Sequence, residues 1–318
     1  MENKLVITPS PHIRTPETTK AIMMDVLIAL FPVVVVAVLL FGYQALVTMV
    51  VAVLAAMITE AVVLRKKDLI SDGSAAVTGL LLAMTLPATV PWWMPAIGSV
   101  VAIILGKQMF GGLGNNAFNP ALVGRAVLVV SWATHMAGDV WPVPKPFSPF
   151  ADVVTAATPL EKEGAELLEV PLMDMFLGNI GGSLGETSAL ALLIGGFWLF
   201  FRGHIDWRVP GCFFATVFLM GAIFGGGIYE NLVLTGVFHL LAGGVMIGAL
   251  FMATDMVTSP VTGLGKVIFG VGCGLLTMII RLWGNYPEGV MFAILLMNAV
   301  TPIIDRYTLP RKFGEVKE

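Results

Sequence analysis

Charged residues are scarce in this sequence: they make up 12% of its 318 residues, whereas hydrophobic residues make up 57%. Soluble domains usually contain about 25% charged residues, so the composition excludes an ordinary soluble fold and indicates that lipid surrounds much of the chain. The formal net charge of -3 argues against a basic surface that binds nucleic acid. Cysteine is also rare, because Cys212 and Cys273 are the only two and have no CxxC spacing. They cannot alone form an iron–sulfur cluster or a structural zinc site.

Long apolar segments, by contrast, are frequent. A helix that crosses lipid needs roughly 20 apolar residues, and fewer where other helices surround it. We expect ten spans, near residues 22–42, 44–64, 74–88, 92–107, 119–136, 189–201, 209–225, 232–254, 266–281 and 287–305. Several are short or are interrupted by glycine or proline, which indicates broken helices. The sequence therefore predicts an all-α, polytopic membrane protein.

Lysine and arginine predict the orientation, because they are enriched in cytoplasmic loops. In the predicted loops and tails they cluster in four regions: residues 4–20, 65–67, 202–208 and 306–317. Ten spans place all four regions on the cytoplasmic side of the inner membrane, together with both termini. The loop 137–188 then lies outside, and its two lysines and eight acidic residues give a net charge of 2 − 8 = −6. Arg281 is an exception, because it falls at the outer end of the ninth span.

Two stretches of the sequence resemble each other at a separation of about 170 residues. Residues 82–85 correspond to 251–254 with an offset of 169, and residues 114–115 correspond to 284–285 with an offset of 170. Five spans per half is an odd number, so the two halves would enter the membrane from opposite sides. Such inverted repeats form binding sites at broken helices in many transporters. Weak self-similarity caused by small residues at helix contacts is the alternative.

These features predict five regions along the chain. They are a cytoplasmic N-terminal segment (1–21), a first five-helix repeat (22–136), an external loop (137–188), a second five-helix repeat (189–305) and a cytoplasmic tail (306–318). A stand-alone secondary transporter or channel, or a structural membrane scaffold, would also fit this organisation.

The external loop contains the sequence DVVTAATPL at residues 152–160. This run of small residues suits neither a membrane span nor a regular strand or helix. It places the hydroxyl of Thr158 on unhindered backbone, six residues after the carboxylate of Asp152. Such a segment suits a modification site that another enzyme binds in extended form. An ordinary turn with a helix N-cap is the alternative, and spacing alone favours it.

The loop resembles the flavinylation motif Asp-x-x-(Ser/Thr)-Gly-Ala-(Ser/Thr), whose final hydroxyl carries FMN through a phosphoester. Asp152, Thr155, Ala157 and Thr158 agree with this motif, and Ala156 replaces its usual glycine. Three further stretches resemble one family of membrane flavoproteins: SPHI at 10–13, GGLGNNAFNPA at 111–121 and ATDMVTSP at 253–260. That family contains the D subunit of Rnf electron transport complexes, and the B subunit of the sodium-translocating NADH:quinone reductase is related to it. The short N-terminal region favours the Rnf D subunits.

The resemblance implies that Thr158 carries FMN covalently, and that a flavin transferase on the outer face recognises Asp152, Thr155 and Ala157. It implies a urea-transporter-like plan of ten helices in two inverted repeats, and a second, non-covalent flavin such as riboflavin. Other subunits of an Rnf-type complex would be partners. The flavin would relay electrons between ferredoxin and NAD through those subunits, coupled to the movement of Na⁺ or H⁺.

Four further residues are candidates for this function. Asn115, Asn116 and Asn119 lie in a segment with four glycines, and their amides could form hydrogen bonds with a flavin ring. They could instead satisfy unpaired backbone groups at broken helix ends. Asp255 follows a glycine-rich span at a position of the repeat, and ionisable residues at membrane depth are often functional. We expect Asp255 to lie on an ion path, with helix capping as the alternative.

Overall fold

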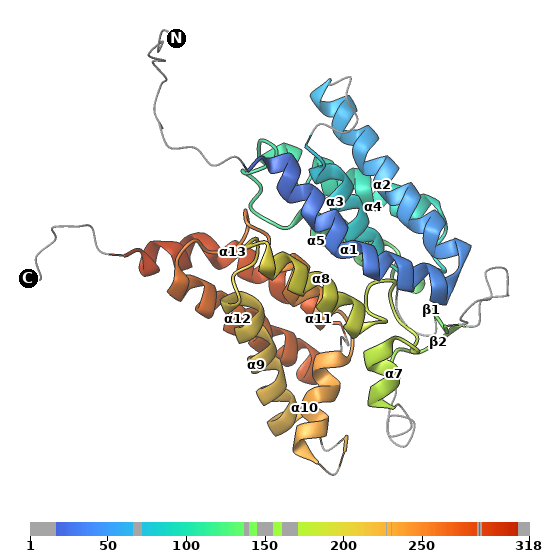
Figure 1. Ribbon diagram of the computed structural model, residues 1–318, viewed down its shortest axis with the longest axis vertical. Coiled ribbons are helices and arrows are strands. Elements are labelled where there is room, and N and C mark those ends of the chain that lie inside the picture. Colours follow the sequence, from blue (N-terminus) through green and yellow to red (C-terminus); the bar gives the residue numbers. More distant parts are fainter. Residues whose placement is uncertain are drawn as a thin grey trace, which may run out of the picture.

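The computed structural model describes residues 17–65, 72–136, 140–144, 155–160, 171–226, 228–229, 231–284, 286 and 288–310. This part of the chain is helical apart from loops and one short hairpin (Figure 1). The first helices are α1 (Thr19–Phe41), α2 (Tyr43–Leu64), α3 (Ser74–Met84), α4 (Trp93–Ile104) and α5 (Pro120–Ser131). The later helices are α7 (Leu172–Leu177), α8 (Ala189–Phe201), α9 (Arg208–Phe224), α10 (Leu232–Leu241), α11 (Val245–Ile247), α12 (Gly263–Trp283) and α13 (Val290–Thr308). Shorter elements are η1 (Gln108–Phe110), η2 (Ala133–His135), the π-helical η3 (Gly248–Met252), β1 (Trp141–Pro142) and β2 (Thr155–Ala156).

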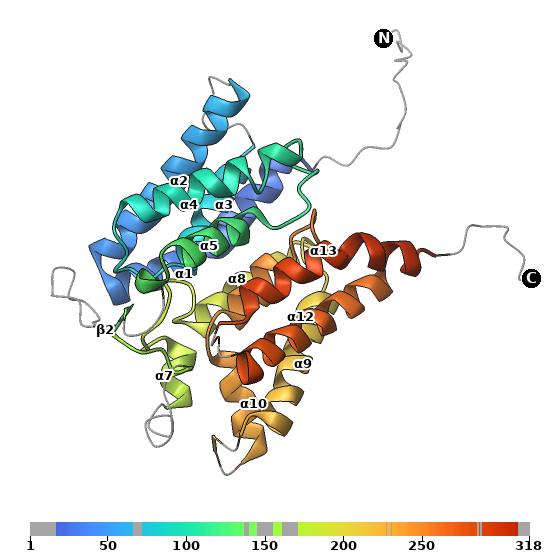
Figure 2. The same ribbon diagram turned by 180° about the vertical axis from the view of Figure 1, so that it is seen from behind.

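The helices form two groups, α1 to α5 and α8 to α13 (Figures 1 and 2). In the first group α2 packs against both α3 and α4, and α4 packs against α5. In the second group α9 packs against both α10 and α12, and α12 packs against α13. The same pattern of packing therefore occurs twice along the chain. Helices α1 and α8 lie against each other and join the two groups.

Five helices are long and apolar enough to cross a membrane: α1, α2, the stretch Trp93–Phe110, α12 and α13. A sixth span results if α10 and the stretch Val245–Met252, which are bent by 70°, form one broken span. The other four predicted spans coincide with shorter apolar helices, α3, α5, α8 and α9. The prediction of a polytopic, all-α membrane protein with broken helices is confirmed.

Helix α1 has one face for lipid and another for protein. The hydroxyl of Thr18 caps its N-terminus by accepting a hydrogen bond from the N–H of Ala21 at 3.2 Å. Large apolar side chains at helical spacing are exposed along one face: Met24, Ile28, Phe31, Val35 and Leu39. An exposed apolar stripe of this length is expected where acyl chains, rather than water, surround the helix.

The protein-facing side of α1 approaches α8 through small residues. A side chain at Gly195 would overlap the carbonyl oxygen of Ala29. Small residues allow membrane helices to approach closely, and van der Waals packing then holds the helices together. Gly195 and Ala29 therefore fix the contact that joins the two groups.

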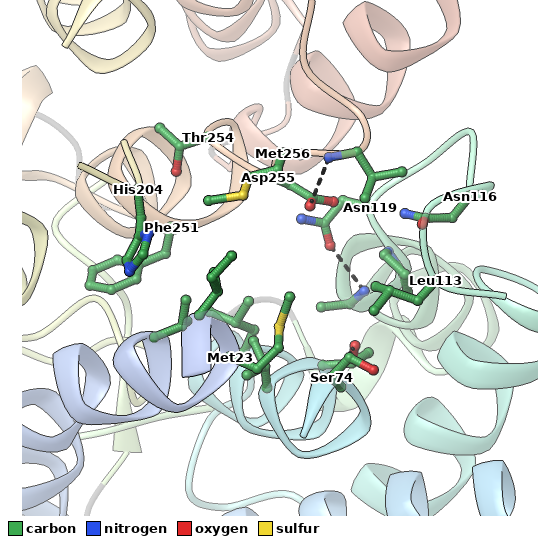
Figure 3. Close-up of a pocket in the computed structure, with 18 of the residues that line it drawn as sticks. Met23, Ser74, Leu113, Asn116, Asn119, His204, Phe251, Thr254, Asp255 and Met256 are labelled. Atoms are coloured by element: carbon green, nitrogen blue, oxygen red, sulfur yellow. Dashed lines mark hydrogen bonds between the residues drawn. The ribbon is translucent and has the colours of Figure 1, made fainter. Parts of the chain in front are cut away.

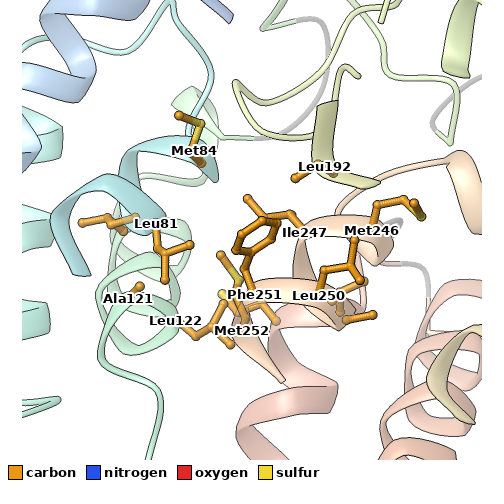
Figure 4. Close-up of a cluster of buried hydrophobic side chains, with 14 of the residues drawn as sticks. Leu81, Met84, Ala121, Leu122, Leu192, Met246, Ile247, Leu250, Phe251 and Met252 are labelled. Carbon is orange, nitrogen blue, oxygen red and sulfur yellow. The ribbon is translucent and has the colours of Figure 1, made fainter. Parts of the chain in front are cut away.

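The core lies where the broken helices of the two groups meet (Figure 4). Leu81 and Met84 of α3 and Leu122 of α5 contribute from one group, and Phe251 and Met252 of η3 contribute from the other. All five are at most 8% exposed. The ends of the interrupted helices are therefore packed inside protein, as irregular backbone at membrane depth requires.

Arg281 satisfies the backbone groups that the break after α10 leaves unpaired. Its guanidinium donates hydrogen bonds to the carbonyl oxygens of His239 at 2.8 Å and Ala242 at 3.1 Å. Basic side chains commonly cap helix C-termini in this way. The exceptional position of Arg281 in the pattern of charged loops thus has a local structural explanation.

Candidate functional site

The segment that resembles a flavinylation motif forms half of a short hairpin. Strand β2 pairs antiparallel with β1, so that Ala156 lies opposite Trp141 and Thr155 lies opposite Pro142. Thr155 is exposed, whereas Thr158 is only 4% exposed. Asp152 lies outside the described residues, so its position relative to Thr158 is a prediction from the sequence alone.

Apolar side chains on both sides of Thr158 fix this hairpin to the helices. Trp141 of β1 is buried, and Leu160 packs in a cluster with Met175 of α7 and Phe238 of α10. Gly243 has a positive φ of 65°, and a side chain there would collide with Leu160. The break after α10 therefore provides the surface on which the Thr158 segment rests.

A pocket of about 850 Å³, partly open to solvent, lies at the other end of α1 (Figure 3). Its walls come from the start of α1, α3, residues 107–121, the loop between α8 and α9, and residues 251–257. Most of these walls are apolar, and a few polar side chains interrupt them. Sites for small organic molecules typically have this composition, with mostly apolar walls and a few polar groups.

Two of the three candidate asparagines line this pocket, and their roles differ. Asn119 caps α5, because its side-chain oxygen accepts hydrogen bonds from the backbone N–H groups of Ala121 at 3.0 Å and Leu122 at 3.4 Å. Its amide nitrogen donates to the carbonyl oxygen of Met252 at 3.2 Å and so connects the two groups of helices. The capping alternative therefore accounts for Asn119.

Asn116 also lines the pocket, and one of its side-chain atoms lacks a hydrogen-bond partner among the described residues. Its amide nitrogen donates to the carbonyl oxygen of Phe118 at 3.2 Å. Its side-chain oxygen is buried and has no hydrogen-bond partner among the described residues. Buried polar atoms of this kind usually have a partner, so Asn116 can accept an N–H from a bound molecule. Asn115 is exposed and does not line the pocket.

Asp255 lines the same pocket from the loop after η3. One of its carboxylate oxygens accepts the N–H of Val257 at 3.3 Å, and the other accepts the hydroxyl of Thr258 at 3.2 Å. The carboxylate thus organises its own loop while it borders the pocket. This geometry is compatible both with helix-end capping and with a position on an ion path.

Sequence reasoning missed a buried ion pair on the pocket wall. The ammonium of Lys107 lies 2.9 Å from the carboxylate of Glu60 and donates to the hydroxyl of Ser74 at 2.5 Å. The side chains of Lys107 and Glu60 are 2% and 7% exposed. A single lysine within a glycine-rich segment at membrane depth was the signal that could have revealed it.

A second missed group joins the start of α1 to the loop between α8 and α9. One carboxylate oxygen of Asp25 lies 2.8 Å from Nε2 of His204 and 3.0 Å from the Arg202 guanidinium. Asp25 and His204 are both largely buried, whereas half of the Arg202 side chain is exposed. Asp25 could be noticed in the sequence as an acid near the start of a span, but its partners lie nearly 180 residues away.

His204 also borders a second pocket of about 570 Å³, which Asp206 and Lys266 line. Burial acts to raise the pKa of Asp206. The backbone N–H of Arg208 and the ammonium of Lys266, both 3.1 Å from its carboxylate, outweigh that effect and lower the pKa. Asp206 is therefore charged at neutral pH and gives this pocket a polar wall.

A third missed group is a buried cluster between the two halves. The guanidinium of Arg125 on α5 forms an ion pair with Glu288 just before α13, and it lies 3.9 Å from the carboxylate of Glu186. Buried charges require such pairing because desolvation is costly. The cluster ties α5 to the segments that precede α8 and α13.

The structure thus separates the candidate residues into two places. Asn116, Asn119 and Asp255 surround one pocket, together with Ile22 at the start of α1. The β1–β2 hairpin lies near the opposite end of α1 in Figure 1, so Thr158 is not brought to that pocket. Helix α1 has 23 residues, which at about 1.5 Å per residue is enough to cross the apolar layer of a membrane.

Helices of this length, interrupted spans packed against each other and a pocket at their broken ends define a polytopic membrane protein with an internal pocket. Sequence comparison identifies which one. Residues 6–314 match the NQR2, RnfD, RnfE family, and the chain belongs to that family.

Its relatives include D subunits of ion-translocating complexes. The chain is 45% identical over 323 residues to that of the Na⁺-translocating ferredoxin:NAD⁺ oxidoreductase complex of Acetobacterium woodii, covering 99% of this chain and 97% of the relative. It is 47% identical over 328 residues to that of the proton-translocating ferredoxin:NAD⁺ oxidoreductase complex of Clostridium ljungdahlii, covering 98% and 97%. It is 39% identical to that of the ion-translocating oxidoreductase complex of Stutzerimonas stutzeri, covering 92% and 91%.

Proposed function

We propose that this chain is the D-type membrane subunit of an ion-translocating oxidoreductase complex and carries FMN covalently on Thr158. The observation that carries the proposal is near full-length identity of 45% and 47% to two D subunits, combined with the motif that ends at Thr158. Bound FMN would supply one- and two-electron transfer, and the chain would supply its position and surroundings. The other subunits of the complex would deliver and remove the electrons, between ferredoxin and NAD.

In this proposal the hairpin at Thr158 faces the outer side of the inner membrane, where a flavin transferase acts. Asp152, Thr155 and Ala157 serve as its recognition positions, and both termini are cytoplasmic. The exposed position of Thr155 suits recognition. Because Thr158 is 4% exposed, the segment 155–160 has to move away from the surface on which it packs before the phosphoester forms.

We also propose that the two groups of helices are inverted repeats of five spans each, residues 22–136 and 189–305, in a urea-transporter-like plan. The duplicated pattern of packing supports this arrangement. So does the coincidence of all ten predicted spans with apolar helices. An odd number of spans per repeat makes the two repeats enter the membrane from opposite sides, and in such inverted repeats broken helices meet near the centre of the membrane.

The pocket at the start of α1 is assigned to a second, non-covalent flavin such as riboflavin. The unpaired side-chain oxygen of Asn116 can accept the imide N–H of an isoalloxazine ring, and the apolar walls can cover its faces. Thr158 lies near the opposite end of α1, so this ring is a separate molecule from the covalent FMN. Electrons would then pass between two flavins near opposite ends of one helix.

Covalent attachment is tested by co-expressing the chain with a flavin transferase and examining the denatured protein for flavin fluorescence on a gel. We expect a fluorescent wild-type band, no fluorescence for T158A, and recovered fluorescence for T158S, which restores a hydroxyl. If the wild-type chain stays dark while the transferase modifies another substrate, the flavin assignment fails. A flavin-free transporter then becomes the leading function.

The pocket is tested with two neighbouring asparagines. N116L removes the unpaired acceptor and should weaken riboflavin binding by about 5- to 150-fold, since one lost hydrogen bond to a buried group is worth about 1–3 kcal/mol. N115L is the matched control, because Asn115 is exposed and outside the pocket. Fluorescence quenching of added riboflavin measures both affinities. Equal weakening by the two variants, or no weakening by N116L, contradicts the assignment.

The relatives do not decide which ion is coupled to electron transfer. The chain is 45% identical to the D subunit of a Na⁺-translocating complex and 47% identical to that of a proton-translocating complex. Asp255 is proposed to lie on the ion path, since its carboxylate borders the pocket. D255N, assembled in the complete complex, should lose ion translocation in vesicles. Full translocation by D255N would exclude this role.

A further inference from the structure

The two pockets described above share part of their lining. His204, Thr254 and Met256 border both of them. Among these three residues of the shared wall, His204 is the one with an ionisable side chain. Figure 3 shows His204 at the edge of the first pocket. Its imidazole therefore stands between the proposed flavin pocket and the polar pocket of Asp206 and Lys266.

Asp25 fixes this imidazole. The 2.8 Å contact uses Nε2, and Nδ1 makes no hydrogen bond within the described part of the chain. A carboxylate at one ring nitrogen sets the tautomer and orientation of a histidine. Arg202 binds the same carboxylate oxygen and keeps it in place. The arrangement leaves Nδ1 as the second position for proton exchange.

We infer that His204 transfers protons between water in the second pocket and a flavin ring bound in the first, with Asp25 as its positioning residue. This inference rests on the proposed function of the first pocket. Two-electron reduction of an isoalloxazine ring near neutral pH also adds a proton, at N5. The two electrons come from a redox centre of a partner subunit. The proton leaves the His204 imidazolium, which becomes neutral imidazole and then takes up a proton (H⁺) from the bulk solvent through the second pocket.

The other charged groups around the two pockets are placed less well for this task. Lys107 borders the first pocket, but its ammonium is bound by Glu60 and Ser74. Asp255 borders the first pocket alone. The groups that border the second pocket alone are Asp206 and Lys266. His204 connects the two sides.

The competing explanation is that His204 only ties α1 to the loop between α8 and α9. H204Q separates the two roles, because a glutamine amide can still donate to Asp25 but does not titrate. The matched control is H135Q, since His135 is exposed and lies at the far end of α5 from the pocket. The full-length chain in nanodiscs, loaded with riboflavin, is reduced with dithionite across the range of about pH 5 to 8 in which histidine titrates.

We expect the reduction rate of the wild type and of H135Q to depend on pH through one protonation. In H204Q the rate should fall at least about tenfold, within the usual range for loss of a general acid, and this pH dependence should disappear. Added imidazole should restore the rate in H204A, because the second pocket is open to solvent. A wild-type rate and pH profile in H204Q would overturn the inference.

A measurement without redox turnover completes the test. In ¹⁵N-histidine NMR spectra of the flavin-free chain, the signal that H204Q removes should titrate, and D25N should shift its titration. Adding riboflavin should move that signal and leave the His135 signal unchanged. A His204 signal that neither titrates nor responds to riboflavin overturns the inference. Failure of the wild type to bind riboflavin is a different result: it contradicts the proposed pocket and the His204 role together.

Discussion

Lys107 illustrates how single residues make a charged pocket wall possible in a chain this apolar. Placing an ammonium or a carboxylate in a low-dielectric interior costs several kcal/mol unless each has a partner with good geometry. Lys107 meets this condition through Glu60 and Ser74, and Ser74 in turn donates to Asp72 at 2.6 Å. The network brings α2, α3 and the segment before η1 together at the edge of the pocket.

Replacing one partner of the Lys107–Glu60 pair should destabilise the fold more than replacing both partners. K107M leaves the Glu60 carboxylate buried without its counter-ion and should destabilise the chain by about 3–5 kcal/mol, while the double variant E60Q/K107M should recover part of that loss. K266M is the control, because the pair of Lys266 with Asp206 is partly exposed and such pairs contribute about 0–1 kcal/mol. Thermal unfolding in detergent, followed by tryptophan fluorescence, ranks the variants. Equal melting temperatures for K107M and K266M would contradict the importance of burial.

At the scale of elements, the positions of the helices and the presence of breaks could be predicted from the sequence, whereas the place and angle of an individual break could not. The apolar run 189–201 and the helix α8 have the same bounds, and α9 differs from its predicted span by one residue at each end. The predicted span 232–254 instead breaks after Leu241 and continues in η3 at a 70° bend. Hydrophobicity reports depth in the membrane, whereas the bend depends on Arg281, which binds the carbonyl oxygens at the end of α10 from another helix.

Candidate sites within one continuous stretch of sequence could be predicted, whereas pairs of distant residues could not. Thr158 lies in a continuous motif, so the sequence alone was enough to single it out. The pairs of His204 with Asp25 and of Lys107 with Glu60 join residues that are far apart along the chain. Nothing in the sequence around these residues indicates that they are partners, because only the fold brings them together. The sequence therefore pointed to Thr158 and to three residues of the pocket wall, Asn116, Asn119 and Asp255, and missed the ion pairs beside them.

The contact between α1 and α8 leads to a prediction for these two elements. G195A should lower the melting temperature in detergent, because the added methyl group collides with the carbonyl oxygen of Ala29 and overpacking typically costs about 1–3 kcal/mol. G211A is the matched control on α9, where the nearest heavy atom lies 3.5 Å from the added carbon. If G195A is no less stable than G211A, close packing at Gly195 does not hold the two groups together.

For the whole molecule, the account requires that the two sites open on opposite sides of the membrane. Single cysteines in a C212A/C273A background test this orientation. T155C should react with a membrane-impermeant maleimide in right-side-out vesicles, and W207C, at a position 62% exposed in the loop beside the pocket, should react only in inverted vesicles. Labelling of both positions from one side would contradict the proposed orientation.

The central claim is that this chain holds its flavin on Thr158, on the side away from the pocket. The most direct measurement is tandem mass spectrometry of the peptide that contains residues 152–158, after co-expression with a flavin transferase. The account predicts a mass increase of one FMN minus one water, located at Thr158 and not at the exposed Thr155. An unmodified peptide from an active transferase, or FMN located at Thr155, would contradict it.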